Sequence, residues 1–279
     1  DLDYTLVIYT PAISKEHPLL AKFKQNEFNV FKRAEVLQKI SENSKCIAVA
    51  GTHGKTTTSA ILAHILKVSD LKFSAFVGGI MVNYNSNFLY NGEDYIIVEA
   101  DEFDRSFLKL NPNYACITSL DPDHLDIYED SNSLIEAFEQ FKSNIVDDGF
   151  LISHEDVRIS SKKYGIIESS DYLAKNITTD KSFSRFDLCF DGGKIENLKL
   201  HSQGLHNVMN SVAAVSIAIE LGISDKKIVE ALSSFKGVER RFSYKIDNET
   251  MVLIDDYAHH PEEIKQVYNT LKLIYPNDN

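Results

Sequence analysis

The order of apolar and polar positions predicts strands and helices that alternate along most of the chain. Short apolar runs indicate strands that a parallel sheet buries on both faces, and these runs are 46–50, 95–98, 114–118 and 150–152. Between them, apolar residues recur at three- and four-residue spacing, which is typical of amphipathic helices; the stripes are at 61–66 and 134–145. We therefore predict an α/β fold with a mostly parallel central sheet and flanking helices.

The two ends of the chain add to this pattern. Residues 1–40 indicate strand, helix, strand and helix in turn. Short alternating runs between 166 and 200, with a turn at Gly192-Gly193, predict antiparallel strands at one edge of the sheet. The remaining segments predict two helices, two strands and a last helix, at 207–221, 224–235, 242–246, 251–254 and from Pro261 onward.

Composition excludes several classes of protein. Hydrophobic residues make up 43% and charged residues 25% of the chain, which excludes a disordered or low-complexity protein. The net charge of −12 argues against binding to nucleic acid or to anionic membranes through bulk electrostatics. Since no apolar run is long enough to span a membrane and the N-terminus lacks a basic flank, we expect a cytoplasmic protein. The three cysteines form no CxxC pair, and we expect buried free thiols.

The most specific motif follows the first of the buried strands. It reads Ala50-Gly51-Thr52-His53-Gly54-Lys55-Thr56-Thr57-Thr58 and precedes an amphipathic helix. Glycines let backbone N–H groups surround phosphate oxygens, and the helix N-terminus adds its positive dipole. In such a loop Lys55 reaches the β- and γ-phosphates, and the Thr56 hydroxyl binds Mg²⁺. The match to GxxxxGK[ST] is incomplete, because valine stands at position 49, yet the context predicts a nucleoside triphosphate site.

Two acidic clusters follow strand ends and are expected to converge on this loop. One is 98–102 (Val-Glu-Ala-Asp-Glu) and the other is 121–126, which contains His124. Ligands of open α/β sheets bind beyond the carboxyl ends of the strands. Glu99 and His124 are therefore candidate Mg²⁺ ligands, with solvated loop charges as the alternative interpretation.

The two clusters and the loop, taken with three later motifs, resemble the Mur ligases, the ATP-dependent amide-forming enzymes of peptidoglycan synthesis. The later motifs are 204–210 (Gly-Leu-His-Asn-Val-Met-Asn), 237–242 (Gly-Val-Glu-Arg-Arg-Phe) and 255–261 (Asp-Asp-Tyr-Ala-His-His-Pro). The family's loop is Gly-Thr-x-Gly-Lys-Thr, which accounts for valine at position 49.

The resemblance also implies a domain organisation. Residues 1–43 would be the end of a Rossmann-like UDP-sugar domain, 44–260 a P-loop-type ATP-binding domain, and 261–279 the start of a third domain. On this interpretation the chain is a piece of a longer protein and is inactive, or nearly so, by itself.

The resemblance implies the reaction and the role of each residue. UDP-N-acetylmuramate and L-alanine would be the substrates, with ATP and Mg²⁺, and Lys55, Glu99 and His124 would be catalytic. Thr56, Glu99 and His124 would hold the metal, while His53, Tyr257 and His259 would contact substrate. The implied ATP-binding residues are Gly51, Thr52, His53, Gly54, Lys55, Thr56, Thr57, His206, Asn207, Asn210, Arg240, Arg241 and Asp256. One of the two arginines would reach ATP, and the sequence does not distinguish them.

Three alternatives stay open at this point. The first is a murein tripeptide ligase, which shares the phosphate loop and the Glu-Ala-Asp-Glu stretch. The second is a non-catalytic Mur-like regulator that binds nucleotide, although retention of Lys55, Glu99 and His124 argues against it. The third is a P-loop GTPase or motor ATPase, which would require a complete Walker A motif and a guanine-type Asn-Lys-x-Asp; the sequence contains neither.

Overall fold

Strand β3 (Lys45–Ala50) lies inside a ten-stranded sheet of the computed structural model, which describes residues 5–10, 12–121, 131–248 and 250–276. The strand order is β12-β11-β10-β9-β8-β7-β3-β6-β4-β5. The seven strands from β10 to β4 in this order run parallel to one another. At one end of the sheet β11 and β12 pair antiparallel, and at the other end β5 pairs antiparallel with β4. The strands joined to β3 are β4 (Phe73–Met81), β5 (Ser86–Tyr90), β6 (Tyr95–Ala100), β7 (Tyr114–Ile117), β8 (Phe150–His154), β9 (Lys162–Gly165), β10 (Tyr172–Thr179), β11 (Ser184–Phe190) and β12 (Gly193–Leu200).

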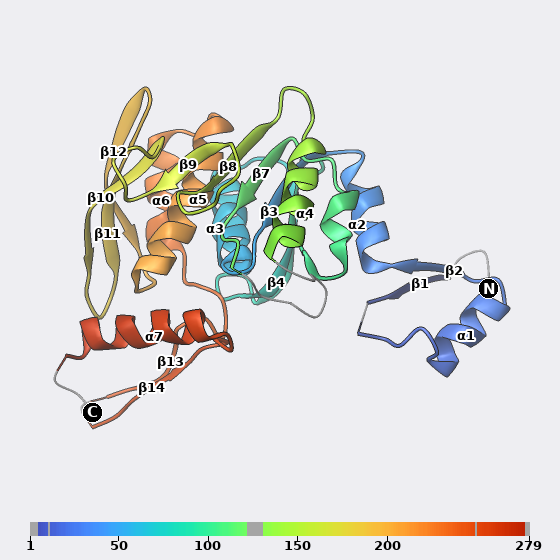
Figure 1. Ribbon diagram of the computed structural model, residues 1–279. Coiled ribbons are helices and arrows are strands. Elements are labelled where there is room, and N and C mark those ends of the chain that lie inside the picture. The colour runs from blue at the N-terminus through green and yellow to red at the C-terminus, as the bar shows by residue number, and fades with distance from the viewer. Residues whose placement is uncertain (1–4, 11, 122–130, 249, 277–279) are drawn as a thin grey trace.

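Helices cover both faces of this sheet, as Figure 1 shows. Successive side chains of a strand point to opposite faces, and in β3 Ile47 and Val49 enter one core cluster whereas Ala48 enters the other. The first cluster is closed by α3 (Lys55–Val68), α5 (Leu205–Glu220) and α6 (Asp225–Ser234). The second is closed by α2 (Arg33–Ser41), the 3₁₀ helix η2 (Phe103–Lys109) and α4 (Ser131–Ser143). The central strand is therefore buried on both sides, as its apolar run predicts.

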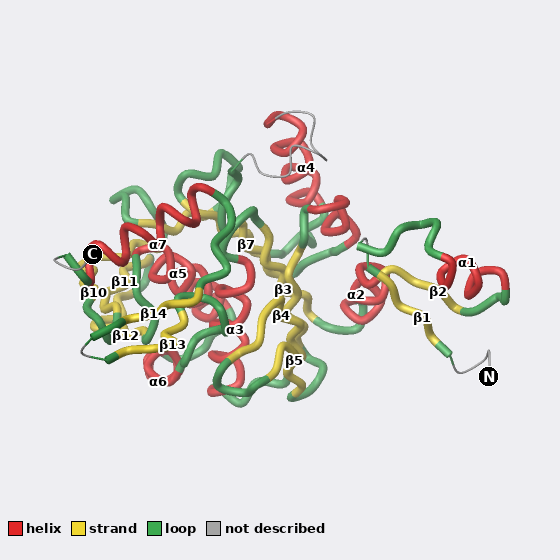
Figure 2. The backbone as a smooth tube through the Cα atoms, turned by 90° about the horizontal axis from the view of Figure 1, so that it is seen from below, coloured by secondary structure: helices red, strands yellow, loops and turns green. Residues whose placement is uncertain are grey.

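Two smaller units flank the sheet. At the N-terminal end, β1 (Leu6–Tyr9) and β2 (Asn29–Lys32) pair in parallel, with α1 (Pro18–Gln25) between them in sequence. At the other end, β13 (Ser243–Asp247) and β14 (Val252–Asp255) form an antiparallel pair, and α7 (Pro261–Ile274) packs against it through a small cluster of Phe242, Ile274 and Tyr275. Figure 2 shows these two units on opposite sides of the sheet. The domain boundaries at 43 and 260 stay predictions.

The expected α/β fold and the antiparallel edge are confirmed, with two differences. Strands β4, β5 and β9 were not predicted, and β5 gives the sheet a second antiparallel end. The predicted strand at 95–98 continues to Ala100, so Glu99 belongs to β6 rather than to a loop after it. Cys46, Cys116 and Cys189 are free thiols, and the first two are buried. In the described part of the chain, no helix is both long enough and apolar enough to cross a membrane.

Candidate functional site

The loop between β3 and α3 has a backbone that only glycine fits at two positions. Gly51 has a φ of 123° and Gly54 a φ of 85°, a region that side chains with a Cβ rarely adopt. A Cβ at Gly51 would lie 2.3 Å from Thr118 Oγ1, and one at Gly54 would lie 2.4 Å from Asn210 Oδ1. The loop is therefore pressed against the end of β7 on one side and against α5 on the other.

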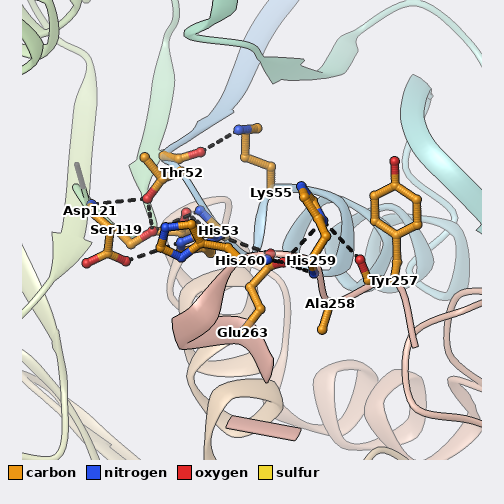
Figure 3. A network of polar contacts seen from close by, with 12 residues as sticks. Thr52, His53, Lys55, Ser119, Asp121, Tyr257, Ala258, His259, His260 and Glu263 are labelled. Carbon is orange, nitrogen blue, oxygen red and sulfur yellow. Dashed lines mark hydrogen bonds and ion pairs between the residues drawn. The ribbon is translucent and has the colours of Figure 1, made fainter. Parts of the chain in front are cut away.

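The residue pair 118–119, directly after β7, ties this loop down. Ser119 Oγ accepts a hydrogen bond from the His53 backbone N–H at 2.9 Å and lies 2.8 Å from Thr52 Oγ1. The Asp121 N–H donates to Thr52 Oγ1 at 3.1 Å, so the second acidic cluster begins against the loop, as Figure 3 shows. His124 belongs to the same cluster but lies outside the described residues.

Lys55, the first residue of α3, makes an ion pair that the sequence did not reveal. Its Nζ lies 2.8 and 3.0 Å from the two carboxylate oxygens of Glu102 and donates to the Gly51 carbonyl at 2.6 Å. The Glu102 side chain has an exposed fraction of 0%. Burial raises the pKa of the Glu102 carboxyl, and the charge of Lys55 opposes that rise.

Thr56 and Glu99 meet next to this pair. The Thr56 hydroxyl donates to Glu99 Oε2 at 3.0 Å, and the Gly78 N–H donates to the other carboxylate oxygen. Burial raises the pKa of Glu99, and these hydrogen bonds oppose it. A hydroxyl and a carboxylate are hard oxygen ligands, so the pair fits Mg²⁺. Within the described ranges no group of three or more His, Cys, Asp or Glu residues is placed to hold a metal, and the expected third ligand, His124, is not among them.

A cavity of about 510 Å³ opens beside the loop, between α5, α7 and the β8–β9 segment. Of the predicted ATP-binding residues, those that line it are His53, Gly54, Thr57, His206, Asn207, Asn210, Arg241 and Asp256. The β8–β9 segment adds a wall that was not predicted, from His154 to Val157 and at Tyr164 and Ile166.

Several of these lining side chains are held by their neighbours. Burial lowers the pKa of His206, so its imidazole is neutral at pH 7. Asn207 donates to the Gln203 carbonyl at 2.8 Å, and Asp256 accepts 2.7 Å hydrogen bonds from the N–H groups of Phe242 and Ala258. These hydrogen bonds fix the orientation of the Asn207 and Asp256 side chains in the cavity wall.

The two adjacent arginines take different positions. Arg241 lines the cavity, and its charge influences both Glu99 and His206. Arg240 does not line it; its Nε lies 3.9 Å from Asp255, and its side chain is 59% exposed. Both guanidinium groups lie over the ring of Tyr257, at 5.0 and 5.2 Å. The geometry therefore favours Arg241 as the arginine that faces a bound nucleotide.

Helix α7 is linked to the loop through Glu263, which sequence reasoning missed. Glu263 Oε1 lies 3.0 Å from His53 Nδ1, and Oε2 accepts from the His259 N–H at 3.1 Å. Burial by itself raises the pKa of Glu263, but the hydrogen bonds from His53, His259 and His260 outweigh it and lower the pKa to about 2. Figure 3 shows this carboxylate between the loop and the segment with Tyr257 and His259, so both predicted substrate-contacting regions are joined. A glutamate in the first turn of a helix suggests a capping residue, and nothing local indicates His53 as its partner.

Comparisons with known proteins agree with this geometry. Residues 49–218 match the family described as the Mur ligase middle domain. A UDP-N-acetylmuramate–L-alanine ligase of Christiangramia forsetii is 48% identical over 98% of this chain and 60% of its own length.

Two solved structures are similar in fold. A UDP-N-acetylmuramate–alanine ligase of Thermotoga maritima has a TM-score of 0.85 at 28% identity, over all of this chain and 67% of its own. A UDP-N-acetylmuramate:L-alanyl-γ-D-glutamyl-meso-diaminopimelate ligase from Neisseria meningitides has a TM-score of 0.72 at 22% identity, over 84% of this chain and 80% of its own, which shows the fold alone. The chain spans about 60% of the length of the curated relatives it matches.

Proposed function

The chain belongs to the Mur ligase family, and from this premise we propose that its protein joins L-alanine to the carboxylate of UDP-N-acetylmuramate in an ATP-dependent reaction. One observation carries the proposal: Thr56 and Glu99 lie 3.0 Å apart beside Lys55, at the start of the helix that follows a phosphate-binding loop. The relatives that match nearly the whole chain at 40–48% identity carry the name of this activity, which supports the choice of substrates.

In this reaction the sugar carboxylate attacks the γ-phosphate of ATP, which gives an acyl phosphate and ADP. The amine of L-alanine then attacks the acyl carbon, and phosphate leaves as the amide forms. Phosphoryl transfer depends mostly on positioning and on neutralising charge. The chain supplies Lys55, the N–H groups of the loop and the N-terminus of α3 for this purpose.

The metal position follows from the same residues. Thr56 and Glu99 would hold Mg²⁺ with His124, and the ion would neutralise negative charge on the phosphates. Glu99 accepts hydrogen bonds from Thr56 and Gly78, and these two contacts fix the orientation of the carboxylate. We therefore assign Glu99 as a Mg²⁺ ligand that fixes the position of the ion.

The nucleoside of ATP fits the cavity beside the loop. Neutral His206 and the amides of Asn207 and Asn210 offer donors and acceptors to a base, and Asp256 lies where a ribose hydroxyl could donate. Arg241 faces the cavity and can bind phosphate oxygens through two parallel N–H groups. Arg240 holds Asp255 at the surface instead.

The substrates of the ligation would meet on the α7 side of the loop. We assign His53 to the sugar carboxylate and Tyr257 and His259 to the amino acid. The Glu263 carboxylate contacts both the His53 ring and the His259 N–H. It therefore fixes His53 and His259 relative to each other. We place the reaction in the cytoplasm, where ATP is available.

The test is a coupled assay of ADP release by the protein, expressed with any flanking segments that its gene encodes. The expected result is ADP formation that requires UDP-N-acetylmuramate and L-alanine together, and its loss in Glu99→Gln. ADP formation only with the tripeptide L-alanyl-γ-D-glutamyl-diaminopimelate would favour the murein tripeptide ligase. No ADP with either acceptor, under conditions in which the nucleotide binds, would favour a non-catalytic protein.

A further inference from the structure

One carboxylate holds the β8–β9 part of the cavity wall together. Glu155 Oε2 accepts hydrogen bonds from the backbone N–H groups of Ile166 and Ile167, both at 2.8 Å, and from the Ser170 hydroxyl at 2.9 Å. These donors belong to the turn 166–170, which directly follows β9. The Glu155 side chain therefore ties this turn to the residue that follows β8.

The Glu155 side chain crosses β9 at a position where a glycine leaves room for it. Gly165 is the last residue of β9, and a Cβ placed there would lie 1.7 Å from Glu155 Oε2. The three atoms nearest to this Cβ all belong to the Glu155 side chain. An alanine at position 165 would therefore push the carboxylate away from the turn, and movement of that flexible side chain would relieve the strain.

The wall that Glu155 stabilises suits an uncharged part of a ligand. Ile166 lines the cavity and is 46% exposed. The described lining residues of this wall include Glu155 and Asp156 but no lysine or arginine. Successive backbone N–H groups can bind an anion, but those of Ile166 and Ile167 each donate their single hydrogen to Glu155. The phosphates therefore belong at the β3–α3 loop, and an apolar ligand surface belongs at Ile166.

From this arrangement, and resting on the proposed nucleotide site, we infer that Ile166 packs against the nucleoside of ATP and that Glu155 is the residue that positions it. The nucleoside is the occupant because Gly54 and Thr57 of the phosphate-binding segment line the same cavity. Ligand sites of this kind combine apolar walls with a few polar groups that fix the orientation of the ligand. Ile166 supplies the apolar contact, and Glu155 keeps it in place.

The first test compares the two neighbouring isoleucines by calorimetric titration with Mg²⁺ and a non-hydrolysable ATP analogue. Ile166→Ala removes most of an apolar side chain from the cavity wall, so it should weaken binding by about five- to tenfold. Ile167→Ala is the matched control, since Ile167 is 53% exposed, belongs to the same turn and does not line the cavity.

Weaker binding in Ile166→Ala, with little change in Ile167→Ala, supports the inference. Equal affinities of the two variants overturn it while leaving the nucleotide site in place. No binding by the unsubstituted protein overturns the proposed site and this inference together. Thermal unfolding of both variants checks that they are folded, which their exposed positions favour.

The second test addresses the positioning role through Glu155→Ala and Gly165→Ala in the assay of ADP release. Each should raise the KM for ATP severalfold and leave kcat nearly unchanged, because the turn no longer holds Ile166 against the nucleoside. Loss of the Glu155 charge by itself would have the opposite effect, since it removes a like charge from beside a triphosphate. The double variant should be no weaker than Glu155→Ala alone, because the atoms nearest to the new Cβ are then gone.

A higher KM for ATP in both single variants, without further loss in the double variant, supports the inference. Additive losses, tighter nucleotide binding in Glu155→Ala, or a rise in the KM for UDP-N-acetylmuramate in place of ATP would overturn it.

Discussion

Gly51→Ala should destabilise the protein by more than the same change at a glycine with open space around it. The new Cβ would lie 2.3 Å from Thr118 Oγ1 and 2.8 Å from the Ser119 backbone nitrogen, at a φ of 123°. A positive φ costs a residue with a Cβ about 1–2 kcal/mol. Displacement of packed neighbours adds about 1–3 kcal/mol. The structure therefore predicts a loss of about 3 kcal/mol in the free energy of unfolding.

Gly192→Ala separates these two contributions. Gly192 has a φ of 92°, yet no atom lies within 4 Å of a Cβ placed there. Its substitution should cost only the backbone strain, about 1–2 kcal/mol. Urea unfolding of both variants and the unsubstituted protein measures the difference directly, provided that the transitions are two-state.

The same two variants should also differ in nucleotide binding. Gly51→Ala should lose binding of a non-hydrolysable ATP analogue, because relief of the contact with Ser119 displaces the loop, whereas Gly192→Ala should keep it. Equal destabilisation of the two variants, or full nucleotide binding by Gly51→Ala, would refute the argument that residues 118–119 fix the loop.

Four other substitutions test the charged groups of the site. Lys55→Ala removes the cation that lies 2.8 Å from the buried Glu102 carboxylate, so it should lower stability by about 3 kcal/mol; addition of Glu102→Gln should recover part of that loss in thermal unfolding. Glu99→Gln should weaken Mg²⁺ binding by about tenfold or more, measured by titration in the presence of nucleotide, and an unchanged Mg²⁺ requirement would exclude Glu99 as a ligand. Glu263 has a pKa of about 2, below its ordinary 4.5, so its ionised contacts with His53 stabilise the protein above pH 4.5 and are lost as the pH falls toward 2. The stability difference between the unsubstituted protein and Glu263→Gln should shrink over that range, and a constant difference would contradict the assignment.

The sequence predicts those features of the fold that are formed by residues adjacent in the chain. The apolar run of β3, the glycines and Lys55 follow one another directly, so the loop and its helix could be identified without a structure. Strand β4 was missed because Gly78 and Gly79 interrupt its apolar run, and β5 is a short, partly exposed edge strand. The same glycines bring the Gly78 N–H to Glu99, a role that periodicity does not indicate.

In the candidate site too, contacts between residues far apart in the chain could not be predicted from the sequence. The 98–102 cluster was expected near the loop, and both of its glutamates contact residues of the first turn of α3. Which glutamate meets Lys55 and which meets Thr56 depends on how the chain turns between β6 and η2. The contact of His53 with Glu263 joins residues 210 positions apart, and only the packing of α7 over the loop creates it.

The most direct test of the account is titration of the protein with a non-hydrolysable ATP analogue, with and without Mg²⁺. The account predicts saturable binding that strengthens with Mg²⁺ and loses this dependence in Glu99→Gln. Absence of binding, or binding of equal strength without Mg²⁺, would contradict the assignment of Lys55, Thr56 and Glu99 to a nucleotide and its metal.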